Sequence, residues 1–339
     1  MKARWEDLAT RARGLAPHLL DGTQLDALAR VPDLGALADA LRPLGFLLPD
    51  AAAVTPELLE LAVRRTAAAR LRTLARWAGG RNAVLAVIFE DEDRRSLRAL
   101  LRGAVQGAPP HERLAALIPT PALPERALAE LAGLPTPRAI TALLTAWGNA
   151  YGSALSAAAA ATHPDLLALE YQLNRTFAAR ALRGARSARS RELIEFVRET
   201  IDLENACTAL VLAGAEPDIP ARPAFLSGGR RLSLAAFLDA VGARQPGDAG
   251  GRLAASLGPG RLAAAFLRRA GEPAALEELL LRERSAALHE RARRDPAGPA
   301  TVLQYILDLR TEVLALRRII WGVALTAPRE FLARAPVPT

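Results

Sequence analysis

Apolar residues recur every three or four positions along most of the chain, which is the period of an amphipathic helix. The segment from Pro56 to Gly80 has a proline in its first turn, glycines at its end and leucines at helical spacing between them. The same pattern predicts helices over 165–182 and 190–212. Runs of alternating β-forming residues are missing, so the pattern predicts an all-α fold.

Parts of this pattern occur more than once. A shift of 103 residues places eight positions on similar residues: Leu25, Leu28, Ala29, Val31, Pro32, Ala36, Leu37 and Leu41 fall on Leu128, Leu131, Ala132, Leu134, Pro135, Ala139, Ile140 and Leu144. A shift of 111 residues places Asp91, Asp93, Leu101 and Gly103 on Asp202, Glu204, Leu212 and Gly214. We interpret the first shift as a helical hairpin written twice, with a weaker third copy at 232–257. A chain of repeated helical units is more typical of a scaffold or coupling part than of an enzyme.

The length of 339 residues fits three units of about a hundred residues each. We predict helical lobes over 1–80, 81–185 and 186–339. Glycine and proline predict loops at 107–110, 214–229 and 247–260, the last of these being the loosest part of the chain.

The formal charge of +8 and the pI near 10.8 raise the question of nucleic acid. Lys2 is the only lysine, so the excess is arginine in an alanine-rich chain, as a GC-rich genome produces. Aromatic residues make up 4% of the chain and form no stacking platform. We therefore do not expect nucleic-acid binding.

The start of the chain lacks the apolar core of a signal peptide. The longest apolar runs, such as 83–89 and 319–325, fall short of the ~18 residues that a membrane span needs. Cys207 has no second cysteine to pair with and is expected to be a small buried hydrophobe. We expect a protein that is soluble, or bound to a membrane through a partner.

Candidate catalytic chemistry is sparse. A single lysine at the terminus excludes a phosphate-binding GxxxxGK[ST] loop and a catalytic Schiff-base lysine. His18, His111, His163 and His289 are far apart and lack carboxylates at metal-ligand spacing, so we predict surface or capping roles. We predict no catalytic residue, no cofactor and no metal.

Two short motifs resemble sites. The run from Gly258 to Ala263 matches GxGxxA, but Pro259 disrupts the tight turn and favours a break between helices. The acidic run Glu90 to Asp93 resembles the magnesium-binding helix of terpenoid synthases, which are also all-α. Arginines follow it directly and no second metal motif appears, so charge pairing at the N-terminal turn of a helix is the better interpretation.

Four arginines recur at three-residue spacing: Arg180, Arg183, Arg186 and Arg189. On a helix they form a basic ridge. A solvated face is the first interpretation, and contact with an acidic partner or lipid headgroups is the alternative.

Several segments together resemble the C-subunit family of A/V-type rotary ATPases, whose vacuolar members are called d subunits. Asp202 and Asn205 precede a leucine-rich stretch and Gly214, and the segment 227–229 reads Ser-Gly-Gly. The last part, 305–332, places Tyr and Glu before Leu-Arg, and 173–177 resembles the family's L-D-R-x-[YF] helix. The resemblance spans nearly the whole chain.

This resemblance implies three all-α lobes arranged about a pseudo-threefold axis as a funnel. It implies a non-catalytic central-stalk subunit on the cytoplasmic face of the membrane. Such a subunit joins the central shaft of the soluble head to the membrane proteolipid ring. ATP hydrolysis or synthesis is thereby coupled to proton or sodium transport.

The sequence departs from the family pattern at several positions. Asn174 replaces the aspartate of L-D-R-x-[YF], Ala315 replaces an asparagine before Leu-Arg, and Val211 and Ala213 stand where the third lobe usually has an arginine. In the second lobe Arg98 or Arg102 supplies that arginine. These changes affect individual polar contacts and not the architecture.

The candidate polar residues are Asp91, Arg94, Asp202, Glu204, Asn205 and Arg317. We expect the repeated acidic turn to cap helices and keep the lobes in register, with direct contact to the shaft as the second interpretation. Arg317 is expected to form a packing or inter-lobe ion pair, or to contact the ring or shaft. An all-helical interaction scaffold, with nucleic acid as one candidate partner, and a magnesium-dependent terpenoid-synthase-like enzyme remain as alternative functions.

Overall fold

The computed structural model describes residues 5–48, 53–79, 82–115, 117–161, 164–214, 221–328 and 332. The predictions for Gly80, His163 and the loop residues 215–220 lie outside the described residues. Within the described ranges the chain folds into α-helices and short 3₁₀ helices without a strand, which confirms the all-α prediction. No helix in these ranges has both the length and the apolar composition that crossing a bilayer requires.

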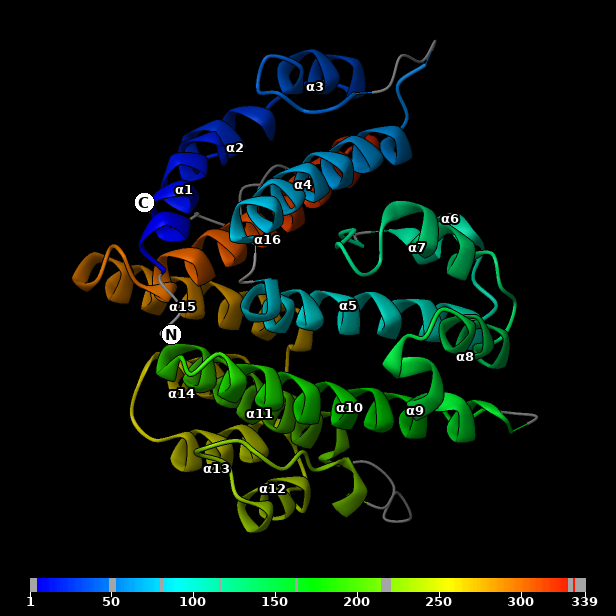
Figure 1. Ribbon diagram of the computed structural model, residues 1–339, viewed down its shortest axis with the longest axis vertical. Coiled ribbons are helices and arrows are strands. Elements are labelled where there is room, and N and C mark those ends of the chain that lie inside the picture. Colours follow the sequence, from blue (N-terminus) through cyan, green and yellow to red (C-terminus); the bar gives the residue numbers. More distant parts are fainter. Residues whose placement is uncertain are drawn as a thin grey trace.

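The longest helices are α4 (Pro56–Ala78), α5 (Asn82–Val105), α10 (Leu166–Ser187), α11 (Arg191–Leu212), α15 (Pro273–Arg294) and α16 (Pro299–Ala324). The shorter elements are α1 (Glu6–Leu15), η1 (Ala16–His18), α2 (Gly22–Leu28), α3 (Leu34–Leu41), α6 (Pro110–Leu114), α7 (Glu125–Ala132), α8 (Pro137–Ala146), α9 (Ala150–Ala159), η3 (Arg222–Ala224), α12 (Leu234–Val241), α13 (Pro246–Leu257) and α14 (Arg261–Arg269). Figure 1 shows the long helices in the middle of the molecule and three groups of short helices around them.

Local sequence signals explain where the long helices begin and end. The Thr55 side chain accepts a hydrogen bond from the N–H of Leu58, Pro56 occupies the first turn of α4, and the helix ends at Gly79 with φ 51°. Ser190 caps α11 in the same way. The helix predicted from Pro56 to Gly80 is found as Pro56–Ala78 and the one predicted over 190–212 as Arg191–Leu212, while the one predicted over 165–182 continues to Ser187.

The repeated sequence lies on pairs of neighbouring short helices. The first copy is α2 and α3, the second is α7 and α8, and the third is α12 and α13. Leu25 and its counterpart Leu128 are both buried, as are Leu28 and Leu131. The repeated positions therefore include core residues in the first two copies, and a shared packing of all the copies stays a prediction.

Two local predictions were wrong. The segment 247–260 is not a loose loop, because Pro246 opens α13 and the helix continues through Gly250 and Gly251 to Leu257. The break is confined to Gly258–Gly260. The acidic run Glu90–Asp93 lies in the middle of α5 and not in an N-terminal turn, so these side chains cap no helix.

The buried apolar side chains of the described residues form two clusters. The larger cluster contains side chains from α1–α5, α7–α10 and α16, from the first half of α11 and from the end of α15. The smaller cluster contains side chains from the second half of α11, from α12–α14 and from the start of α15. The last long helix, α16, packs against α15 and also against α4 and α1 near the start of the chain. The division into three lobes and the funnel remain predictions.

Candidate functional site

Arg94 lies at the centre of a polar network that joins α5, α10 and α11. Its side chain is fully buried. The guanidinium donates hydrogen bonds to Oδ1 of Asp91 (2.6 Å), Oε1 of Glu204 (2.7 Å) and Oδ1 of Asn174 (2.9 Å). Its central carbon lies 4.7 Å from the centre of the Phe177 ring. Only a planar group with several donors in fixed directions serves all these partners at once.

The network keeps its carboxylates ionised despite their burial. Burial alone would raise the pKa of Glu204, but the charges of Arg94 and Arg98 hold that pKa well below its ordinary value. Burial would likewise raise the pKa of Asp91, and Arg95 together with Arg94 lowers it instead. The pKa of Arg94 is raised because its two carboxylate partners outweigh desolvation. The cluster is therefore a set of charges that stabilise one another in the interior.

Asp202 and Asn205 bind the chain segment that leads into α12. The carboxylate of Asp202 is buried and accepts hydrogen bonds from the backbone N–H groups of residues 230, 231 and 232 at 2.9–3.1 Å. The amide of Asn205 pairs with both backbone groups of Leu226, at 2.8 and 2.9 Å. Their contacts are internal, so the structure places both residues in a role of positioning this segment.

The glycines of the Ser-Gly-Gly sequence allow that close approach. A Cβ on Gly229 would lie 2.1 Å from Oδ1 of Asp202, which no side chain permits. Gly228 has a φ of 112°, and a Cβ there would lie 2.3 Å from Cδ1 of Leu182. The segment can therefore lie directly on α11 only with glycine at both positions.

Asp93 has a similar place in α5. It is buried and accepts a hydrogen bond from the hydroxyl of Thr120 (2.5 Å), and the same hydroxyl accepts from the N–H of Leu123 (3.0 Å) just before α7. Asp93 and Asp202 each bind the segment that precedes a short helix, α7 for Asp93 and α12 for Asp202. The sequence shift of 111 residues instead aligns Asp202 with Asp91. Asp91 instead shares Arg94 with Glu204.

Arg317 on α16 forms an ion pair with the buried Glu60 on α4, with Nε 3.1 Å from Oε1. Trp321, one turn further along α16, donates its indole N–H to the other oxygen of Glu60 (3.1 Å). Arg317 thus takes part in the packing of α16 on α4, and part of its side chain remains exposed.

The four ridge arginines do not form one uniform row. Arg180 forms an ion pair with Glu90 on α5 and lies over the ring of Tyr151. Arg183 and Arg186 are exposed on α10, while Arg189 follows the helix end with a φ of 52°. Arg180 is exposed as well, so what separates it from the other three is its ion pair with Glu90.

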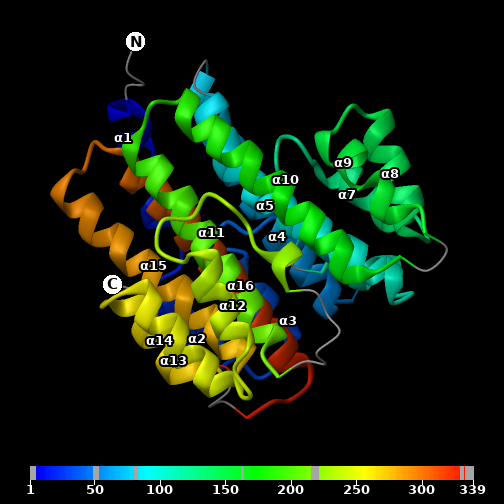
Figure 2. The same cartoon turned by 90° about the horizontal axis from the view of Figure 1, so that it is seen from below.

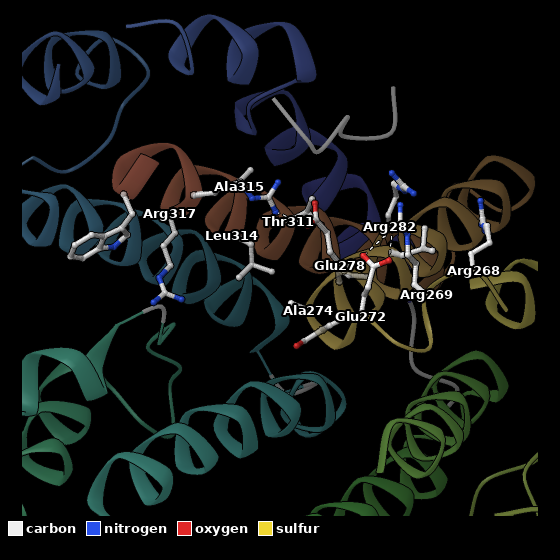
Figure 3. Close-up of a pocket in the computed structure, with 16 residues that line it drawn as sticks. Arg268, Arg269, Glu272, Ala274, Glu278, Arg282, Thr311, Leu314, Ala315 and Arg317 are labelled. Atoms are coloured by element: carbon white, nitrogen blue, oxygen red, sulfur yellow. Dashed lines mark hydrogen bonds and ion pairs between the residues drawn. The ribbon is translucent and has the colours of Figure 1, made fainter. Parts of the chain in front are cut away.

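A groove of about 900 Å³ runs between α15 and α16 (Figure 3). Leucine and alanine side chains such as Leu314 and Ala315 form part of its lining, together with Trp321. Five arginines and three glutamates also line it: Arg268, Arg269, Arg282, Arg317, Arg318, Glu272, Glu277 and Glu278. Four of these arginines have carboxylate partners: Arg268 with Glu283, Arg269 with Glu272, Arg317 with Glu60 and Arg318 with Glu278. The groove therefore combines apolar surface with charges that are largely paired.

The described residues offer little for catalysis. They contain no group of three or more His, Cys, Asp or Glu side chains placed to bind a metal ion. In the acidic run each carboxylate has a partner, because Glu90 pairs with Arg180, Asp91 with Arg94, Glu92 with Arg310 and Asp93 with Thr120. The GxGxxA sequence is a helix break, with Gly258 and Gly260 at φ 75° and 154°.

Several important contacts were not predicted from the sequence. Glu312 on α16 accepts the N–H of Leu20 (2.8 Å) and pairs with Arg70 on α4. Arg284 on α15 pairs with Glu199 on α11 at 3.0 Å and lies over the ring of Phe196. A carboxylate among leucines in a long helix signals such a contact, but its partner lies far away in the chain.

Comparison with known proteins adds a family. A family model described as ATP synthase (C/AC39) subunit matches residues 8–334. No curated protein matches the chain in sequence. Since the family model covers nearly all of the chain, the chain belongs to the ATP synthase (C/AC39) subunit family, as its resemblance to the A/V-type rotary ATPases implied.

Proposed function

We propose that this protein is a non-catalytic central-stalk subunit of a rotary ATPase or ATP synthase. It links the central shaft of the soluble head to the membrane proteolipid ring and couples ATP hydrolysis or synthesis to proton or sodium transport. The observation on which this rests is the family match over residues 8–334. The complex places the subunit on the cytoplasmic face of the membrane, with lobes at 1–80, 81–185 and 186–339 forming the funnel.

The internal architecture suits a part that transmits torque. Long helices are cross-linked by buried ion pairs, with Arg94 joining α5 to α11 and Glu312 joining α16 to α4, and Glu312 also binds the backbone of Leu20 between η1 and α2. Breaking one partner of such a pair is costly, so the helices resist sliding past one another. Stiffness of this kind transmits force, and it requires no nucleophile or cofactor.

We place the shaft contact in the groove between α15 and α16. Its apolar lining fits the non-polar face of a partner helix, and Arg282 fits an acidic side chain beside that face. Leu314 is half-buried there and in Figure 3 lies between the labelled residues of the two helices. The occupant is a helical tip of the shaft with acidic flanks.

Reconstitution tests the coupling role. A rotary ATPase lacking this subunit should hydrolyse ATP without moving ions, and adding the subunit back should restore ion transport. Transport that is equally good without the subunit would refute the assignment.

The groove is tested separately by Leu314→Asp, with Leu267→Asp as the control. Leu267 is 66% exposed on α14 and does not line the groove. Leu314→Asp should weaken binding of purified shaft subunits by at least about tenfold, the equivalent of about 1.4 kcal/mol. Equal binding by both variants would mean that the shaft binds elsewhere on the subunit. The coupling role would be unaffected by that result, because the reconstitution experiment tests it independently.

A further inference from the structure

Three long helices end in exposed arginines. Within their last seven residues, α4, α10 and α15 together present seven arginines, and an eighth follows the end of α10. They are Arg72, Arg76, Arg183, Arg186, Arg189, Arg291, Arg293 and Arg294, and every one is exposed. We call this set the arginine face.

The three helix ends lie in the left half of the molecule in both Figure 1 and Figure 2, and in Figure 1 the end of α15 is farthest to the left and the end of α4 nearest the middle. Packing between the elements agrees with the views. A Cβ on Gly184, near the end of α10, would lie 2.5 Å from Cγ2 of Val87 near the start of α5, which follows the end of α4. Arg11 of α1 lies 5.1 Å from the centre of the Trp77 ring at that same end.

Among the residues that the structure describes, the arginine face lacks acidic partners. No described carboxylate forms an ion pair with any of its eight members, whereas arginines elsewhere are paired, as Arg102 is with Glu170 and Arg252 with Asp239. The neighbouring segments on this side add the following charged residues: Glu6, Asp7, Arg11 and Arg13 in α1, Arg191, Glu192, Glu195 and Arg198 in α11, and Glu290 and Asp295 at the end of α15. Of these, Glu195 pairs with Arg191 and Glu290 with Arg261, so positive charge predominates.

The helix dipole explains only part of this arrangement. A cation in the last turn of a helix is favourable, which accounts for Arg76, Arg186 and the end of α15. Arg72 and Arg183 lie about one turn earlier, where that effect has faded. Three helices that end on one side with unpaired arginines create a field that self-repulsion makes unfavourable unless an anionic partner is present.

The surroundings indicate which anion. The exposed large hydrophobic residues of the described chain all lie outside these helix ends: Leu47, Val54, Val105, Trp147, Val211, Leu238, Leu267 and Leu325. A folded protein partner requires an apolar core in its interface, and this face lacks one. Nucleic acid requires a continuous track for its backbone, and three separate helix ends do not form one. Phospholipids diffuse within the membrane plane, so their headgroups can reach arginines that lie on separate helix ends. Guanidinium groups also bind phosphate well.

We propose that the arginine face binds the surface of an anionic phospholipid membrane. The contact is electrostatic and peripheral, and each arginine near the surface strengthens it by about fivefold. This contact is a property of the chain itself and does not depend on the shaft or the ring, so it can be measured on the isolated full-length protein.

The test is sedimentation with phosphatidylcholine vesicles prepared with and without phosphatidylglycerol. The wild-type chain should bind only the vesicles with phosphatidylglycerol, and binding should weaken with added salt. Arg183→Gln with Arg186→Gln should reduce vesicle affinity by roughly 25-fold. The matched control replaces Arg126 and Arg138, which are exposed on α7 and α8, with Gln and has the same net charge.

The control should bind within about twofold of the wild-type chain, since its arginines lie on another side. An equal loss in both double variants would mean that net charge alone drives binding, which overturns the proposal. Absence of vesicle binding at low salt would also overturn it. Tighter binding of a DNA duplex than of the vesicles would also overturn the proposal if only the α10 variant lost that DNA binding. The arginine face would then be a nucleic-acid site.

Discussion

Arg94 stands where only a fully paired guanidinium is tolerated. Its side chain is buried against Phe177 and is hydrogen bonded to three acceptors on three helices. Replacing it with methionine leaves Glu204 and Asp91 in the interior without their main partner. We expect Arg94→Met to lower the free energy of unfolding by about 3–5 kcal/mol, measured by urea denaturation.

The control for that substitution is Arg126→Met, at an exposed position on α7. It should change the free energy of unfolding by less than about 0.5 kcal/mol. If Arg94→Met cost no more than this control, Arg95 and Arg98 would suffice to neutralise the carboxylates. The central position given to Arg94 would then be incorrect.

Asp93 introduces a dependence of stability on pH. Burial, only partly offset by the Thr120 hydroxyl, raises its pKa from 3.8 to about 7 in the folded protein. The folded state thus binds the proton more tightly than the unfolded state does. Asp93 therefore makes the protein less stable as the pH rises from about 4 to about 7, and it has no further effect above that range.

Asp93→Asn removes this titration while keeping an acceptor for Thr120. We expect the loss of stability between pH 4 and 7 to become smaller in the variant, as measured by thermal unfolding at a series of pH values. Asp26→Asn, an exposed position on α2, is the charge-matched control. An unchanged pH dependence in Asp93→Asn would mean that water reaches the carboxylate.

Single polar residues could be identified from the sequence more readily than their partners. Asp202, Asn205 and Arg94 attract attention because polar groups among leucines must be satisfied when the helix is buried. Their partners on other elements lie 21 to 110 residues away, so pairing depends on tertiary packing. This is why the capping role predicted for Asp91 was wrong while its importance for packing was visible.

Among the elements, the segment 226–232 depends on α11 for its position. Asn205→Ala leaves the N–H and C=O of Leu226 without their partners, and each lost bond costs about 1 kcal/mol. We expect amide hydrogen exchange over 224–232 to accelerate by roughly 10- to 30-fold through local opening. Ser256→Ala removes only a hydrogen bond within α13 and should leave this exchange unchanged. Equal rates in the two variants would contradict the role of Asn205.

Helix boundaries could be predicted where a cap stands beside a periodic segment, as at Pro56 and Ser190. The prediction failed at 247–260 because glycine and proline have two meanings. Pro246 opens a helix when it occupies the first turn, and Gly250 lies inside α13 because a Cβ there would lie 2.9 Å from the carbonyl oxygen of Phe266 on α14. The need for close helix packing, which composition does not reveal, decides this element.

The whole molecule is closed by contacts between its first and last helices. The periodicity predicts many helices, but it does not say that α16 packs on α1 and α4, because every amphipathic helix presents a similar apolar stripe. The polar contact that distinguishes this arrangement is Glu312, which binds Arg70 and the N–H of Leu20. Its partners are 242 and 292 residues away.

Glu312→Leu tests whether this contact secures the closure. The substitution leaves a buried N–H unsatisfied at Leu20 and leaves Arg70, whose side chain is 12% exposed, without its carboxylate. We expect the free energy of unfolding to fall by about 2–4 kcal/mol. Hydrogen exchange should rise more in α1 than in α5, because α1 packs on α16 and Glu312 binds the backbone of Leu20 just after α1 and η1.

The comparison for Glu312→Leu is Glu278→Leu, which removes from α15 the half-exposed partner of Arg318 on α16. That pair is open to solvent and should contribute less than about 1 kcal/mol. If both variants exchanged uniformly over α1 and α5, the chain would unfold as one unit and Glu312 would have no special part in joining its two ends. A selective rise in α1 would show that the last helix holds the first in place, as a rigid coupling part requires.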